Sequence, residues 1–125
     1  MTAPFDEFLT QYAKASESYD RERIAGFFYC PCTFLRGETV VLLDTPEKVR
    51  EFLAIGFRAY GDSGCVNFVA RLLSARSLGK RFGLIDVDWT ITSAEGKPVM
   101  HFQTTYNLID DRGQWKIYAI TRHDE

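Results

Sequence analysis

The sequence has few of the residues from which metal and redox sites are built. Its three cysteines, Cys30, Cys32 and Cys65, are an odd number for a disulfide framework. The segment Cys30-Pro31-Cys32 lacks the two-residue spacer of zinc ribbons and thioredoxin-like sites, and the two histidines lie far from the cysteines in the sequence. We therefore expect free thiols in a reducing compartment, no bound metal and no cofactor.

Charge and long apolar runs are also scarce. Fifteen basic residues face seventeen acidic ones, which gives a net charge of −2, and no basic stripe with interleaved aromatic residues predicts a nucleic-acid partner. No run reaches the roughly 18 apolar residues of a membrane span, and the first residues lack the pattern of a signal peptide. Phosphate-binding loops and serine-nucleophile elbows are missing as well. We expect a cytoplasmic protein with no membrane partner.

Apolar and aromatic residues, in contrast, are plentiful, at 46% and 14% of the sequence. Each buried Leu, Val or Phe side chain contributes roughly 1.5–3 kcal/mol to folding, so the core needs no disulfide or metal. A chain of 125 residues is the size of one domain, and it contains no repeat or linker. We predict a single domain over residues 1–125.

Helical spacing of apolar residues predicts three helices in the first half of the chain. The first covers Pro4–Tyr19, and Thr2 can cap it. A short second helix starts after Asp20, and we expect Pro31 to end it, since the residue before a proline avoids the helical region. The third starts at the cap Thr45, has Pro46 in its first turn and stops at Gly61. Its apolar face contains Val49, Phe52, Leu53, Gly56, Phe57 and Tyr60.

Strand-like runs dominate the second half of the chain. Two short runs, Thr33–Leu35 and Thr39–Leu43, precede the third helix. Four long runs follow it, at Val66–Leu78, Arg81–Ala94, Lys97–Ile109 and Gln114–His123. Tight turns at Gly79-Lys80 and Glu95-Gly96 predict an antiparallel meander, with Arg71 opposite Asp88, Asp88 opposite Gln103 and Asp86 opposite Thr105. The predicted class is α+β, with a curved antiparallel sheet wrapped around three N-terminal helices.

Side-chain alternation then assigns each residue of the long strands to a face of the sheet. The apolar face, which we expect to receive the helices, contains Val66, Phe68, Ala70, Leu72, Ile85, Val87, Trp89, Ile91, Met100, Phe102, Tyr106, Leu108, Trp115, Ile117 and Ala119. The polar face contains Arg71, Asp86, Asp88, Thr90, His101, Gln103, Thr105, Asn107, Lys116, Tyr118 and Arg122. Apolar Leu73, Tyr118 and Ile120 on that polar face favour a subunit interface.

Several segments of the sequence are similar to one family of proteins. They are the helical run Phe5–Tyr19, the start Thr45-Pro46-Glu47, the strand Ile85-Asp86-Val87-Asp88-Trp89-Thr90 and the ending Gly113-Gln114-Trp115-Lys116-Ile117. Over nearly its whole length the chain resembles the nuclear-transport-factor-2-like (cystatin-like cone) superfamily, which includes SnoaL-like cyclases and ketosteroid isomerase. These segments mark the fold and do not specify a function, because the fold supports isomerases, lyases, hydrolases and binding modules.

The resemblance implies a pocket at the mouth of the cone and a homodimer formed through the outer sheet face. Aromatic walls with a few polar groups are typical of small-molecule sites, so we expect an apolar or aromatic ligand. The expected lining residues are Tyr12, Phe28, Phe34, Phe57, Tyr60, Trp89, Phe102, Thr104, Tyr106, Trp115, Ala119 and Thr121.

Candidate catalytic residues are sparse around this pocket. Isomerase chemistry needs a carboxylate base and a hydroxyl donor in an apolar cavity; Tyr12 could be the donor, and only Glu38 and Asp44 near the mouth remain as bases. A cyclase or dehydratase would use an inward His or Asp, whereas the inward positions expected on the last strand are Ala119 and Thr121.

A second set of candidates is Arg71, Asp86 and Asp88, with His101. Two carboxylates around a guanidinium resemble the arrangement of epoxide hydrolases in the superfamily, where one acts as base and the other as acid. The predicted register places these residues on the outer face, where Arg71 and Asp88 form an ordinary cross-strand ion pair. A β-bulge would bring them inside.

Two functions therefore stay open at the level of sequence. The first is a small-molecule-binding cone, with lyase, isomerase or hydrolase activity on its ligand left open. The second is a non-catalytic dimeric module that binds a partner protein. Polar groups converging on open space would favour the first, and a cone closed by large side chains would favour the second.

Overall fold

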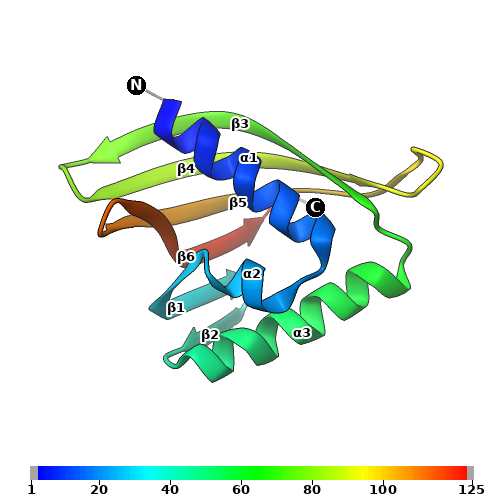
Figure 1. Cartoon of the computed structure of the whole chain (residues 1–125), viewed down its shortest axis with the longest axis horizontal. Coiled ribbons are helices and arrows are strands. Elements are labelled where there is room, and N and C mark those ends of the chain that lie inside the picture. The colour runs from blue at the N-terminus through cyan, green and yellow to red at the C-terminus, as the bar shows by residue number, and fades with distance from the viewer. Residues whose placement is uncertain (1–2, 124–125) are drawn as a thin grey trace.

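The computed structural model describes residues 3–123, which form three helices and one six-stranded sheet (Figure 1). The helices are α1 (Ala3–Ser18), α2 (Arg21–Ala25) and α3 (Pro46–Asp62). The strands are β1 (Phe28–Arg36), β2 (Thr39–Leu43), β3 (Asn67–Leu78), β4 (Phe82–Thr92), β5 (Pro98–Asp111) and β6 (Gln114–His123). The predicted α+β class, with a curved sheet around helices, is confirmed. Among these helices, none is long and apolar enough to cross a bilayer.

The start of α3 is the helix boundary that the sequence predicts best. The Thr45 hydroxyl accepts a hydrogen bond from the Lys48 backbone N–H at 3.2 Å, and Pro46 is the first helical residue. The predicted stop at Gly61 is wrong, because the helix continues to Asp62 and the left-handed residue is Gly64, at φ +80°. The expected cap of α1, Thr2, lies outside the described residues.

The predicted extent of the second helix is also wrong. Helix α2 ends at Ala25, and strand β1 already begins at Phe28, so that Pro31 lies inside a strand. Strand β1 pairs with β6, and the register of that pair shifts between Phe28 and Thr33. Proline has no N–H to give to a ladder, and a break in the register is where a strand tolerates it.

The sheet has the strand order β2-β1-β6-β5-β4-β3. Four neighbouring pairs are antiparallel as predicted, whereas β1 and β6 run parallel. Helix α1 crosses one face of β3–β6, and α3 runs along the end of the sheet that contains β1 and β2 (Figure 1). A hydrogen bond at 2.9 Å from the Phe68 backbone N–H to the Glu17 carboxylate fixes the end of α1 to β3.

The cross-strand pairs of the long strands confirm the predicted register. Arg71 lies opposite Asp88, and Asp88 lies opposite Gln103. The turn between β3 and β4 is one residue longer than expected, because Leu78 pairs with Phe82. A bulge at Leu73 takes up the extra residue and restores the register beyond it.

A second bulge, at Tyr118 in β6, changes which residues face the helices. Ile117 pairs with Leu108, but Ala119 pairs with Asn107, so Tyr118 is the inserted residue. A one-residue insertion reverses the alternation beyond it. Four face assignments on β6 are therefore corrected. Ala119 and Thr121 lie on the outer face, whereas Ile120 and Arg122 turn toward the helices. Val66, which was expected on the apolar face, lies outside β3 and is exposed.

Candidate functional site

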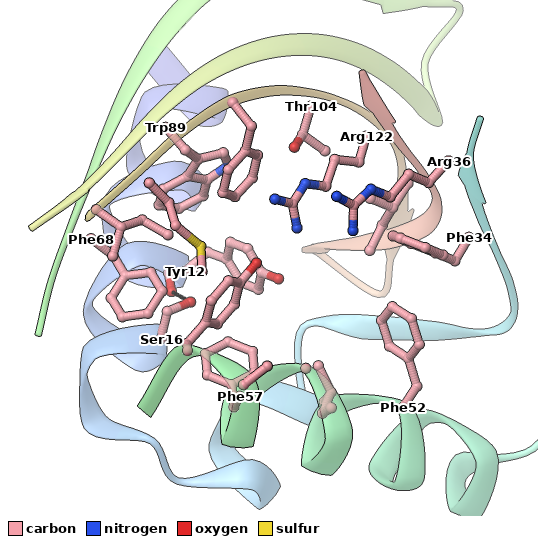
Figure 2. Close-up of a pocket in the computed structure, with 18 of the residues that line it drawn as sticks. Tyr12, Ser16, Phe34, Arg36, Phe52, Phe57, Phe68, Trp89, Thr104 and Arg122 are labelled. Atoms are coloured by element: carbon pink, nitrogen blue, oxygen red, sulfur yellow. Dashed lines mark hydrogen bonds between the residues drawn. The ribbon is translucent and has the colours of Figure 1, made fainter. Parts of the chain in front are cut away.

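A cavity of about 450 Å³ lies between the concave face of the sheet and helices α1 and α3 (Figure 2). Most of the predicted lining residues do border it: Tyr12, Phe28, Phe34, Phe57, Tyr60, Trp89, Phe102, Thr104 and Tyr106. The other three do not. Trp115 packs against Phe5 with ring centroids 5.0 Å apart, and Ala119 and Thr121 are on the outer face because of the bulge in β6.

The lining also includes residues that the sequence analysis did not assign to a pocket. Some belong to the predicted apolar faces, and the sequence could have shown them: Phe52, Leu53 and Gly56 on α3, and Phe68, Ile91 and Met100 on the sheet. The two that matter most for chemistry are Arg36 and Arg122. Arg36 follows the expected strand Thr33–Leu35 and is the last residue of β1, whereas the predicted register places Arg122 on the outer face.

The two arginines make one end of the cavity cationic. They are directly paired across the parallel strands β1 and β6, and Figure 2 shows both guanidinium groups pointing into the cavity. The Arg122 guanidinium carbon lies 3.8 Å from the centroid of the Phe102 ring, a cation–π contact. Thr104, directly opposite Arg122 on β5, adds a buried hydroxyl on the same side.

The other end of the cavity is aromatic. Trp89 donates a hydrogen bond from Nε1 to the Tyr106 hydroxyl at 2.9 Å, and the Tyr12 ring lies edge-on to both of these side chains. Burial raises the pKa of Tyr12 well above its usual value, and burial likewise raises the pKa of Tyr106. Both phenols are therefore neutral at physiological pH and can serve as hydrogen-bond donors, not as bases.

The remaining catalytic candidates lie on the opposite face of the sheet. Asp88 is within 2.8 Å of His101 Nε2, 3.3 Å of Gln103 Nε2 and 3.8 Å of the Arg71 guanidinium. Asp86 accepts hydrogen bonds from Ser74 and Thr105, and the bond from Thr105 lowers the pKa of this carboxyl. The bulges leave the outward orientation of Asp86 and Asp88 unchanged, so this network does not open into the cavity.

Neither of the two carboxylates expected as bases near the mouth, Glu38 and Asp44, borders the cavity. Asp44 forms an ion pair with Lys48 at 2.8 Å, and Glu38 is exposed. Within residues 3–123, no Asp, Glu or His borders the cavity, and no cluster of three or more His, Cys, Asp or Glu side chains could hold a metal ion. The site therefore contains hydroxyl and guanidinium donors in an aromatic enclosure.

This combination of a curved sheet, enclosing helices and an aromatic cavity agrees with the family comparison. Residues 2–125 match the family described as NTF2-like protein (DUF6841). The chain belongs to this NTF2-like family. No curated protein matches the sequence.

Solved structures of NTF2-like and cystatin-like proteins share the fold. An NTF2-like protein of unknown function from Shewanella oneidensis has a TM-score of 0.79 at 12% identity, covering 98% of each chain. A protein of unknown function from Mycobacterium tuberculosis has a TM-score of 0.76 at 19% identity, covering 98% of this chain and 70% of the other. A ketosteroid isomerase-like protein from Erwinia carotovora has a TM-score of 0.71 at 11% identity, covering 98% and 96%. At these identities the similarity shows the fold alone.

Proposed function

We propose that this NTF2-like protein binds a small molecule with an apolar or aromatic body in the cavity between the sheet and helices α1 and α3. The observation that carries the proposal is the volume of about 450 Å³, which lies within the range of roughly 300–1,000 Å³ typical of ligand sites. Arg36 and Ile55 border the cavity and are exposed, so a ligand can enter beside them.

The cavity is open to solvent on one side, so water or a ligand can fill it and it need not be a dry void. Empty cavity volume in a protein core costs about 24 cal/mol per Å³, so a dry void of this size would cost on the order of ten kcal/mol. That is comparable to the whole stability of a domain. Hydroxyl and guanidinium groups in the wall support occupation by water or by a partly polar ligand.

The proposal is binding without an assigned reaction. Lyase, isomerase and hydrolase reactions of the kinds that the fold supports require a general base within reach of the substrate. The described lining offers Tyr12 and Tyr106, whose raised pKa values keep them protonated, and two arginines. Binding needs no general base, so the protonated tyrosines and the arginines can contribute to it as hydrogen-bond donors.

The outer face of the sheet supports a second proposal, a homodimer formed by this face. The helices lie on the concave side (Figure 1), and Val69, Leu73 and Phe82 are 56%, 39% and 37% exposed. Arg71 lies beside Asp88 on the same face, and its side chain is exposed, so a second copy can present a carboxylate to it. As part of the same proposal we place the protein in the cytoplasm, where its three free thiols stay reduced.

Native mass spectrometry of the gently purified protein tests both proposals together. We expect a dimer that carries a discrete extra mass, which denaturation releases, because apolar walls retain a hydrophobic ligand through purification. A protein that holds no extra mass and gains none when incubated with phenylnaphthylamine, a neutral compound with two aromatic groups, would contradict the binding proposal. A monomer at micromolar concentration would contradict the dimer.

A further inference from the structure

The cavity has two chemically different ends, and their separation indicates what class of molecule fits. Trp89, Phe68 and Tyr12 form an aromatic end, whereas Arg36 and Arg122 form a cationic end (Figure 2). We propose that the ligand is an organic anion whose charged group binds to the two arginines while its apolar body packs in the aromatic end. This inference rests on the proposed binding function.

The pairing of the arginines brings two sets of donors to one point. Arg36 and Arg122 occupy neighbouring positions on adjacent parallel strands, and both side chains point into the cavity. Each guanidinium carries five N–H donors in a planar fork, which suits the oxygens of a carboxylate, sulfonate or phosphate.

Neighbouring side chains hold Arg122, the less exposed of the two arginines, in place. Arg122 is half-buried, and its guanidinium carbon lies 3.8 Å from the centroid of the Phe102 ring. Contact with a ring face restricts the guanidinium, while its N–H donors lie in its own plane and can still reach an acceptor. Thr104, 2% exposed and directly opposite Arg122, contributes a hydroxyl toward the same space.

The charge of the entrance also favours an anion. Arg36 is exposed at the mouth and carries a positive charge there. A positive charge at the mouth of a cleft raises the local concentration of anionic ligands. The anion would therefore meet Arg36 first and Arg122 deeper inside, with its rings directed toward Trp89.

Two fluorescent probes that differ by one charged group test this inference. Anilinonaphthalene sulfonate has two aromatic groups and a sulfonate, and phenylnaphthylamine has the same rings without the charge. We expect Arg36→Gln and Arg122→Gln each to weaken sulfonate binding roughly ten- to a hundredfold, the usual size of a charge-assisted hydrogen bond. Affinity for the neutral probe should change by less than about twofold, since its binding depends on the rings.

A matched control and a conservative variant complete the design. Arg58→Gln makes the same charge change on α3, at an exposed residue outside the lining, and should leave both probes unaffected. Arg122→Lys keeps the charge but loses the planar fork, so its sulfonate affinity should fall between those of the wild type and Arg122→Gln. Arg36 is exposed, so its variant should keep the wild-type melting temperature even if the Arg122 variants do not.

The outcomes separate the two proposals. If the wild type binds neither probe, the binding function itself is overturned. If it binds both probes, and the arginine variants leave the sulfonate affinity unchanged or weaken both probes equally, the anion inference is overturned while the binding function stands. A selective loss of the sulfonate in both Arg36→Gln and Arg122→Gln supports the inference.

Discussion

Phenylalanine in place of Gly56 is expected to weaken probe binding about ten- to a hundredfold while leaving the fold at least as stable. Gly56 lies in α3, borders the cavity, and a Cβ built on it meets no atom within 4 Å. A side chain there enters open space and displaces part of the ligand. Losing the burial of one aromatic ring costs a ligand roughly 1.5–3 kcal/mol, which gives this change in Kd.

The stability of the same variant should not fall, because glycine is a poor helix former. Inside a helix it costs about 0.5–1 kcal/mol relative to alanine, and Gly56→Ala should recover most of that in urea unfolding. Gly61→Phe is the matched control, because Gly61 is on the same helix and exposed, and does not border the cavity. It should bind both probes normally. A Gly56→Phe variant that binds as tightly as the wild type would show that the probes bind elsewhere.

Alanine in place of Gly83 should have the opposite effect and destabilise the protein by about 1–3 kcal/mol. Gly83 lies in β4 beneath the start of α1, and a Cβ on it would lie 2.6 and 2.7 Å from two ring carbons of Phe5. Phe5 is 2% exposed and packs against Trp115, so its ring has little room to move. Forcing an extra methyl group into a packed core typically costs this amount.

Urea unfolding of a double-mutant cycle assigns that cost to the contact with Phe5. Gly83→Ala should lower the midpoint with an unchanged slope. In a Phe5→Leu background the same substitution should cost clearly less, because the smaller side chain leaves space for the new methyl group. If Gly83→Ala instead stabilises the protein, as alanine does in an unobstructed strand, then α1 does not pack this closely on β4.

These two glycines also show where sequence reasoning succeeds and where it stops. Alternation along the strand implies that Gly83 shares the face of Ile85 and Val87, and helical spacing predicts Gly56 on the apolar face of α3. Neither pattern reports the distance to the facing element. One glycine therefore marks a close approach of two elements and the other marks open space, and only the assembled layers distinguish them.

The fold itself was predictable because its local signals agree with each other. Thr45 and Pro46 define the start of α3, and the pairing of Arg71 with Asp88 follows from the turns and the alternation. The bulge at Leu73 cancelled an error in the expected turn length. In β6 no second irregularity cancelled the error. The bulge at Tyr118 reversed the faces of the residues that follow it.

That single insertion explains why Arg122, one of the two arginines at the cationic end of the cavity, was missed. Tyr118, Ala119 and Ile120 are all compatible with a buried position, so either alternation gives an acceptable apolar face for β6. The available signal was Ile120, an aliphatic residue assigned to the polar face and in fact 7% exposed. Bulges form where a curved sheet has to bend around its helices, and that curvature is a property of the whole sheet.

The two tryptophans offer the most direct measurement of whether the cavity is the binding site. Trp89 borders the cavity and donates its indole N–H to Tyr106, whereas Trp115 packs against Phe5 away from it. Titration of anilinonaphthalene sulfonate into isotope-labelled protein can be followed through the two indole N–H signals in a heteronuclear NMR spectrum. We predict that the Trp89 signal shifts with saturation and that the Trp115 signal stays in place. A saturable shift of Trp115 alone, or no shift of Trp89 at saturating probe, would contradict ligand binding in this cavity.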